Sequence, residues 1–126
     1  MSLHESAENY LETILILSRK NPCVRSVDIA AALDYTKPSV SVAMKNLRNA
    51  DCIEMDASGL ITLTERGLAI AESMYERHIL LSEWLISLGV SEKNALDDAC
   101  RIEHVISAES FEAIKKHVAP HERFKA

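Results

Sequence analysis

Apolar residues recur at helical spacing along most of this chain of 126 residues, with few interruptions. A repeat of that period is typical of α-helices that bury one face. Glycine and proline number only three each, too few for the many turns of an all-β fold. Because 48% of the residues are hydrophobic and 26% are charged, the chain has enough apolar surface to form a core. The sequence therefore predicts a folded, mainly α-helical protein.

The first part of the chain is expected to contain three helices. They cover residues 5–20, residues 26–33 and a stretch that ends near Asn49. Ser26 is expected to be the N-cap of the second helix, and Pro38 suits the first turn of the third. The apolar residues expected to face the core are Tyr10, Leu11, Ile14, Leu15, Leu17, Ile29, Ala30, Leu33, Val40, Met44 and Leu47.

Residues 52–63 contain two short apolar runs around a turn with Gly59, a pattern typical of a β-hairpin. Helix, turn, helix and hairpin, in that order, form a winged helix-turn-helix. Three more helices are expected: about 65–88 after Thr64, Ser91 to about 106, and Ser107 or Ser110 to near Pro120, before a frayed tail over 121–126. We therefore expect a mainly α fold with a small hairpin: a winged helix-turn-helix domain over 4–66 and a helical domain over 67–120.

The charge of the chain is polarised. The whole carries a net charge of −5, but residues 18–50 hold six basic and two acidic side chains, a net +4, and the remainder carries −9. A basic front is typical of nucleic-acid binding, although a scattered solvated face would give the same count. A recognition helix needs short polar side chains near base edges and cations for phosphates further along. We expect DNA contacts from Thr36, Lys37, Pro38, Ser39, Ser41, Lys45 and Arg48. A winged helix used for protein contacts is the alternative.

Cys100, Glu103 and His104 stand at i, i+3 and i+4 of an expected helix, on one face. A thiolate, a carboxylate and an imidazole together form half of a transition-metal site. Cysteine and histidine on a helix face are often only core and rim, so the interpretation needs partners from other helices. The candidate ligands, with those partners, are Glu12, His78, Cys100, Glu103, His104 and Asn9.

Four segments resemble the metal-dependent repressor family typified by the diphtheria toxin repressor and the manganese transport regulator. They are residues 7–14 (AENYLETI), 37–41 (KPSVS), 63–67 (LTERG) and 98–107 (DACRIEHVIS). The resemblance covers about residues 5–118. It implies a winged helix domain joined to a helical dimerisation domain, with a divalent metal between them that switches on operator binding.

The resemblance also implies a role for each candidate ligand. Cys100, Glu103 and His104 match the regulatory metal site, and His78 matches the ligand on the long helix. Glu12 matches the first-helix carboxylate of the manganese branch, where Asn9 replaces an aspartate. Ser82 and Leu96 replace the residues of the iron branch's ancillary site, so that second site is not expected; nor is the SH3-like third domain of that branch.

The expected cofactor is a divalent transition metal, Fe(II) by preference with Mn(II) as a close alternative, since a thiolate ligand shifts preference away from Mn(II). The expected partners are double-stranded operator DNA and a second copy of the chain, with no membrane and no small organic substrate. No apolar run reaches the length of a membrane span, and no signal peptide opens the chain. Three widely spaced cysteines are typical of a reduced, cytoplasmic protein.

The sequence thus predicts a metal-responsive transcriptional regulator, most simply a repressor, and not an enzyme. One alternative is a thiol-switch regulator of the same fold, in which Cys100 or Cys52 is oxidised. A small metal-dependent hydrolase is a further alternative, but it would need a general base in a cleft, for which no motif is found.

Overall fold

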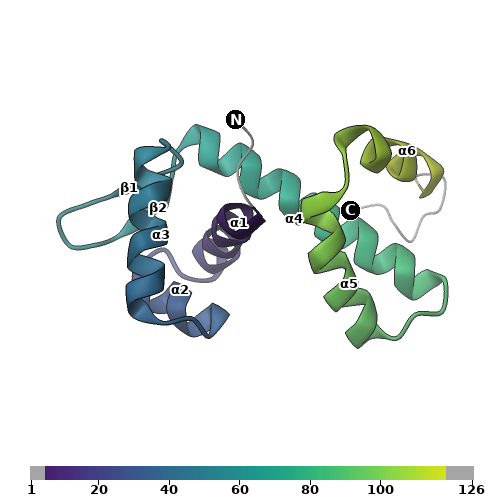
Figure 1. Ribbon diagram of the computed structural model, residues 1–126, viewed down its shortest axis with the longest axis horizontal. Coiled ribbons are helices and arrows are strands. Elements are labelled where there is room, and N and C mark those ends of the chain that lie inside the picture. The colour runs from purple at the N-terminus through teal and green to yellow at the C-terminus, as the bar shows by residue number, and fades with distance from the viewer. Residues whose placement is uncertain (1–4, 119–126) are drawn as a thin grey trace. The chain divides into compact units, whose positions relative to one another are not determined.

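A computed structural model of the chain describes residues 5–118, and within them the fold is mainly helical with one two-stranded antiparallel hairpin. The expected fold class is confirmed. The chain divides into two compact units, residues 1–73 and 74–126, and the division falls inside the long helix α4 (Glu65–Ser87). The two units are therefore described one at a time (Figure 1).

The first unit contains α1 (Glu5–Lys20), α2 (Ser26–Leu33), α3 (Lys37–Asn49), β1 (Ile53–Met55), β2 (Ile61–Leu63) and the start of α4. Its helices pack on one another, and α1 also contacts β2 while α3 contacts β1. The hairpin pairs Ile53 with Leu63 and Met55 with Ile61. The core is formed by Leu11, Ile14, Ile29, Val40, Met44, Ile53 and Ile61, all nearly inaccessible to solvent. This arrangement is the predicted winged helix-turn-helix.

The expected N-cap of α2 is wrong by one residue. The N-cap of α2 is Arg25 and not Ser26, which is already helical. The carboxylate of Asp28 accepts a 2.9 Å hydrogen bond from the backbone N–H of Arg25, and so extends the capping interaction one residue further back. The strands begin after Cys52 and Leu60. The backbone of Cys52 is instead bonded to Leu47 and Thr64, so it belongs to the loop.

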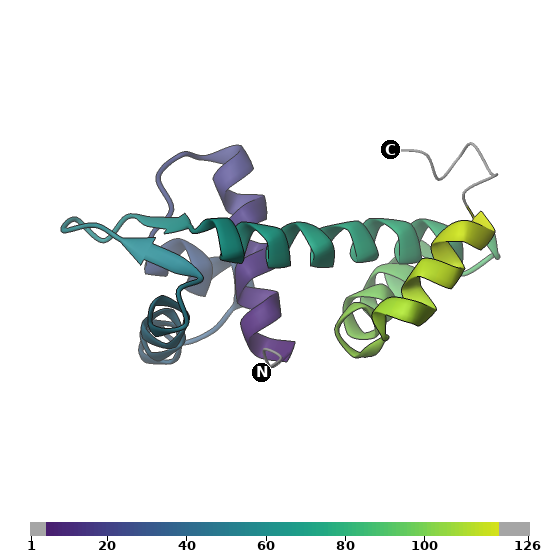
Figure 2. The same cartoon turned by 90° about the horizontal axis from the view of Figure 1, so that it is seen from above.

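The second unit contains the rest of α4, α5 (Glu92–Val105) and α6 (Ala108–Val118). Figure 2 shows α5 and α6 beside the C-terminal half of α4. Ser91 caps α5 by accepting a hydrogen bond from Asn94 N. Ser107 caps α6 through Ser110 N at 3.0 Å, which decides between the two expected starts of the last helix. Its expected end near Pro120 and the frayed tail lie outside the described residues.

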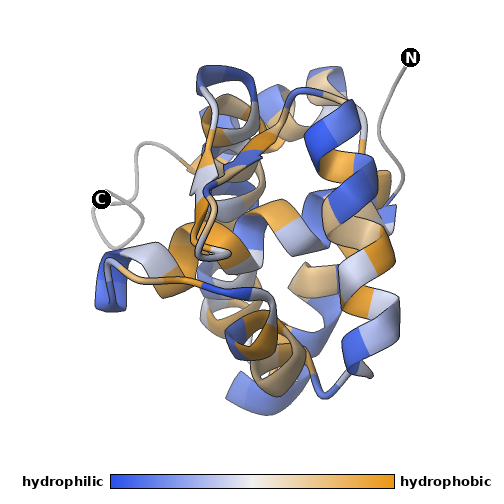
Figure 3. Cartoon of the chain, turned by 90° about the vertical axis from the view of Figure 1, so that its left-hand side faces the viewer, coloured by the Kyte–Doolittle hydropathy of each residue, from blue (hydrophilic) through white to orange (hydrophobic). Residues whose placement is uncertain are grey.

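The helices of both units are amphipathic, as blue and orange residues alternate along them in Figure 3. α5 buries Ala95, Ala99 and Glu103, which repeat every four residues along one face. Two alanines on that face allow close approach to a neighbouring helix, and they carry the carboxylate of Glu103 into the interior. In the part of the chain that the structure describes, no helix combines the length and the apolar character of a membrane span.

Candidate metal centre and nucleic-acid interface

α3 begins with a well-defined cap. Thr36 is its N-cap, and the Thr36 hydroxyl accepts a 3.3 Å hydrogen bond from the backbone N–H of Ser39 while it donates to the Ser39 hydroxyl at 2.8 Å. Pro38 occupies the first turn, as expected. Pro38 has no N–H and Val40 N donates to the Thr36 carbonyl, so the Lys37 N–H is the amide of this turn that these bonds leave for an anion such as a phosphate.

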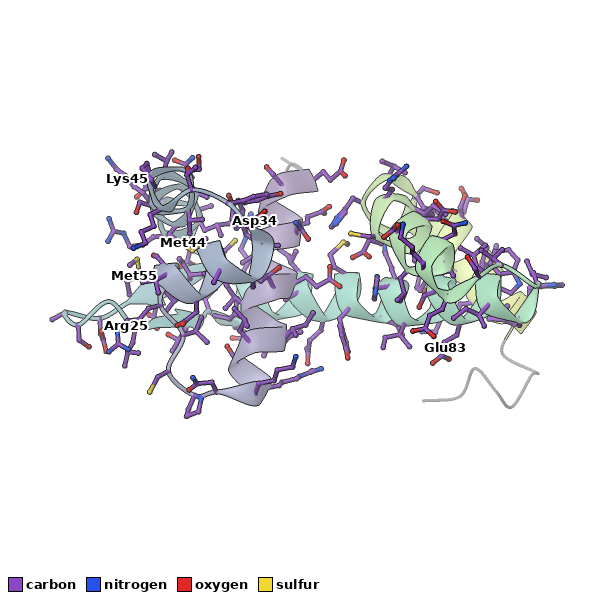
Figure 4. All side chains as sticks on the ribbon, turned by 90° about the horizontal axis from the view of Figure 1, so that it is seen from below. Arg25, Asp34, Met44, Lys45, Met55 and Glu83 are labelled. Carbon is purple, nitrogen blue, oxygen red and sulfur yellow. The ribbon has the colours of Figure 1, made fainter. Side chains whose placement is uncertain are left out.

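The outward face of α3 is basic and polar. Val40, Met44 and Leu47 are buried on one side of the helix, and Figure 4 shows Lys45 on the side away from Met44. The helix contains no acidic residue. All seven predicted DNA-contacting residues are exposed, namely Thr36, Lys37, Pro38, Ser39, Ser41, Lys45 and Arg48. The structure therefore leaves them available to a ligand, and their contact with DNA stays a prediction.

The hairpin turn is organised by a carboxylate. Asp56 Oδ1 accepts hydrogen bonds from the backbone N–H groups of Ser58 and Leu60 and from the Ser58 hydroxyl, each 2.9 Å long. These hydrogen bonds lower the pKa of Asp56 below its usual value, and the bond from Leu60 N–H makes the largest contribution. Arg25 lies beside this turn in Figure 4 and donates to the carbonyl of Ser58 at 3.2 Å. Sequence reasoning missed that contact, because no local pattern links residues 33 positions apart.

His78 on α4 and Glu103 on α5 form the centre of the candidate metal site. His78 Nδ1 lies 2.9 Å from Glu103 Oε1; the Glu103 side chain is 0% exposed and that of His78 is 25% exposed. His78 therefore packs against the helix that bears Cys100. A buried carboxylate is rare unless something compensates its charge, so this pair marks an unusual place in the second unit.

The second oxygen of Glu103 suits a cation. Oε2 is buried and has no hydrogen-bond partner among the described residues, a costly state for a carboxylate oxygen. His104 Nε2 lies 3.7 Å from it, on a side chain that is 2% exposed. Two ligand atoms that each bind one ion at about 2.1 Å stand roughly 3–4 Å apart. Glu103 and His104 therefore fit a divalent transition metal.

The other predicted ligands have different settings. Cys100 is exposed on α5, whereas its neighbour Ala99 is buried. Glu12 and Asn9 lie on α1 in the first unit, where Glu12 is buried and Asn9 is half-buried. Participation of these three residues in a metal site stays a prediction.

Arg77 was not singled out from the sequence, although it holds the segment that carries the candidate ligands. Its Nη1 donates to the carbonyls of Glu103 and Ile106, at 3.1 and 2.9 Å, at the end of α5. Its guanidinium also lies 5.4 Å from the ring centroid of Phe111 on α6, within cation–π range. The sequence signal that could have pointed to Arg77 is its position directly before the candidate ligand His78.

Comparison with known proteins identifies the family. Residues 2–58 match the family model described as the iron dependent repressor N-terminal DNA binding domain, and residues 64–123 match the iron dependent repressor metal binding and dimerisation domain. The transcriptional regulator MntR of Escherichia coli O6:H1 is 34% identical over 93% of this chain and 76% of its own length. The chain belongs to the iron-dependent repressor family. An uncharacterized HTH-type transcriptional regulator of Methanocaldococcus jannaschii is 30% identical over 90% of this chain and 92% of its own.

Solved structures agree with this family placement. The manganese regulator SloR matches with a TM-score of 0.80 and 27% identity over 94% of this chain, which spans 55% of the SloR chain. A hypothetical protein from Sulfolobus solfataricus, at 16% identity and a TM-score of 0.71, shows the fold alone. The relatives that this chain matches are transcriptional regulators. The expected class, a metal-dependent transcriptional repressor and not an enzyme, is thus confirmed, and the comparisons give no support to a thiol switch.

Proposed function

We propose that this chain binds double-stranded operator DNA as a homodimer when a divalent metal ion occupies a site that includes Glu103 and His104. The observation that carries the proposal is the buried Glu103 carboxylate, with one oxygen on His78 and the other lacking a hydrogen-bond partner among the described residues. A cation supplies the missing charge compensation. We further propose a DNA-binding domain over 4–66, a metal-binding and dimerisation domain over 67–120, and action in the cytoplasm, where operator DNA lies.

The proposed ligand set is larger than the pair Glu103 and His104, whose geometry fits a metal ion. His78, Glu103 and His104 provide two imidazoles and a carboxylate in the second unit. Cys100 and Glu12 are added because the resemblance assigns them this role, with Asn9 as a weaker amide ligand. A bound ion would link α1 to α5 and so limit the orientations of the DNA-reading unit.

Cys100 is proposed as the residue that discriminates between metals. Imidazole and carboxylate ligands serve both Fe(II) and Mn(II), whereas a thiolate is a softer ligand and favours Fe(II). The similarity to a manganese regulator favours Mn(II). We retain Fe(II) as the proposed ion and Mn(II) as the alternative. Replacement of Cys100 by Glu should raise the Mn(II) affinity relative to Fe(II), measured by anaerobic titration.

The DNA-reading role belongs to α3. Its first turn carries short polar side chains suited to the base edges of a major groove, and Lys45 and Arg48 follow further along for phosphates. In a two-fold dimer, two such helices must lie about 34 Å apart, or a multiple of that, to enter successive grooves. An ion that binds this arrangement about 100-fold better than others would be a sufficient switch.

The proposal is tested by selecting duplexes from a random-sequence library with Mn(II)-loaded or Fe(II)-loaded protein and measuring their affinity with and without metal. We expect metal-dependent binding, lost in His104→Ala with the helical content unchanged. The matched control is His117→Ala, since His117 is exposed in the last turn of α6. Equal metal stimulation in His104→Ala would contradict the site, and selection of no duplex would contradict the function.

A further inference from the structure

One apolar side chain on α3 faces solvent. Val42 is 60% exposed, whereas Val40, two residues earlier, is 0% exposed. At 100° per residue, Val42 stands about 200° around the helix from Val40 and hence almost opposite the buried stripe. It therefore lies at the centre of the face that the proposed function directs toward DNA.

The surroundings of Val42 are suited to a polyanion. One turn before it lies Pro38, and three residues after it lies Lys45, both exposed. Figure 4 shows Lys45 projecting from this outer side of α3, away from Met44. Because α3 contains no acid, the face attracts phosphates, and an apolar residue in its middle would be brought close to base edges.

A valine at this place is not explained by folding. Its β-branched side chain loses rotamer freedom in a helix and gains no burial in return. Val42 also has no hydrogen-bonding atom, so it reads neither a donor nor an acceptor. In the major groove the one apolar feature of a base pair is the C5-methyl group of thymine.

We propose that Val42 determines sequence specificity by packing against the C5-methyl group of a thymine in each half of the operator. This inference rests on the proposed function, because it requires α3 to enter a major groove. The first two turns of α3 hold no arginine, asparagine, glutamine or glutamate, and Lys37 is their one side chain of the kinds that most often read bases by hydrogen bonds. An apolar contact is therefore expected to supply a large share of the direct readout.

The test uses full-length, Mn(II)-loaded protein and a duplex that it selects from a random-sequence library. Each thymine of the duplex is replaced in turn by uracil, which lacks only the C5-methyl group. Loss of one buried methyl contact should weaken binding by about fourfold, and by about 15-fold when both half-sites are replaced. We expect such a loss at one thymine per half-site.

The variants identify the residue responsible. In Val42→Ala the same thymine-to-uracil replacement should have no effect, whereas Val42→Ile should keep the sensitivity. The matched control is Val27→Ala, since Val27 is an equally apolar residue of α2 that is 54% exposed; it should keep the wild-type pattern. Because alanine is the better helix former, Val42→Ala should unfold at the same temperature as wild type or higher. Weaker DNA binding by this variant would then not be caused by misfolding.

The possible outcomes distinguish failure of the assignment of Val42 from failure of the proposed function. Sensitivity to uracil that survives in Val42→Ala, or that is absent from the wild type, overturns the assignment of Val42 while metal-dependent DNA binding stands. Selection of no duplex overturns the proposed function and this inference with it. Loss of sensitivity in Val27→Ala as well would show that the effect is not specific to α3, and would also overturn the assignment.

Discussion

Glu103 combines two properties that conflict in a protein without a ligand. Its side chain is fully buried, and only one of its two oxygens has a hydrogen bond. The surrounding residues nevertheless hold it in place, since His78 contacts the carboxylate and Arg77 contacts the backbone carbonyl. Such fixed, incompletely compensated groups are frequent at functional sites, where a ligand completes the compensation.

Replacement of Glu103 by Gln should separate metal binding from folding. The amide keeps the shape and a hydrogen bond to His78, so the free energy of unfolding without metal should change by about 1 kcal/mol or less. The affinity for Mn(II) should fall by about 100-fold or more, since loss of mere outer-shell support already costs up to that much. Titration calorimetry and thermal unfolding measure the two effects. Asp98→Asn, at an exposed carboxylate of the same helix, is the control; equal loss in both variants would contradict a specific site.

Lys45 is expected to contact a phosphate rather than a base. Its side chain is exposed on the basic face of α3, beyond the first turn. Lys45→Ala should therefore weaken binding to all duplexes alike and reduce the slope of log K against log salt by about 1 per contact, or about 2 for a dimer. Lys93→Ala, an exposed lysine of α5, should leave the slope unchanged. A slope that does not differ between wild type and Lys45→Ala would remove Lys45 from the interface.

The sequence predicts the elements well where local chemistry decides them. Caps at Thr64 and Ser91 are confirmed by the hydrogen bonds that their side chains accept, because a cap needs only a short polar residue before a helical stretch. The expected cap of α2 is wrong by one residue, because the Asp28 carboxylate accepts a hydrogen bond from Arg25 N and the cap is Arg25 instead of Ser26.

In the candidate site, too, the sequence predicts what local spacing decides and not what packing decides. Helical spacing placed Glu103 and His104 near each other, and packing of α4 on α5 was enough to bring in His78. Spacing alone did not reveal that Cys100 is exposed while Glu103 is buried. That difference depends on which side of α5 meets α4, and the buried Ala95 and Ala99 settle it.

Gly67 is required where α4 starts beside the hairpin. A Cβ at this position would overlap the carbonyl oxygen of Cys52, a backbone atom that accepts a hydrogen bond from Thr64 N. In an ordinary helix Gly→Ala stabilises by roughly 0.5–1 kcal/mol. Here the overlap should reverse the sign, and Gly67→Ala should destabilise by about 2 kcal/mol, measured by urea unfolding. Arg66→Ala, at the exposed neighbour, should change stability little; a stabilised Gly67→Ala would contradict the close approach.

The hairpin turn should lose stability in acid through Asp56. Its pKa is lowered from 3.8 by hydrogen bonds, first from Leu60 N. Because the pKa of Asp56 is lower in the folded protein than in the unfolded chain, its ionised carboxylate stabilises the fold fully above the unfolded-state pKa. This stabilisation is lost as the pH falls from about 4 through the folded-state pKa. Asp56→Asn should therefore be less stable than wild type at pH 6, and the difference should shrink toward pH 3. Circular dichroism melts measure it, with Glu54→Gln as the control. A difference independent of pH would contradict the role of the charge.

At the scale of the whole molecule, the family's function requires that an event in one unit affects the other. The chain offers one covalent connection with regular structure for this purpose, since α4 runs through the junction between residues 73 and 74. A helix transmits orientation but does not by itself respond to a metal. The proposed function assigns the response to the ligands, and Glu12 is the proposed carboxylate ligand of the first unit.

Glu12 is therefore the residue through which metal coupling of the two units is best tested. With wild-type protein, Mn(II) should slow backbone hydrogen exchange both in α5 and in α1, because a shared ion makes local opening of either helix break a ligand bond. In Glu12→Gln the protection of α5 should persist, through His78, Glu103 and His104, while the protection of α1 should disappear. Peptide-resolved mass spectrometry measures both helices in one experiment. Glu5→Gln, at an exposed carboxylate of the same helix, should behave as wild type. If α1 were protected equally in Glu12→Gln, the first unit would sense the metal by another route, and a ligand role for Glu12 would be wrong.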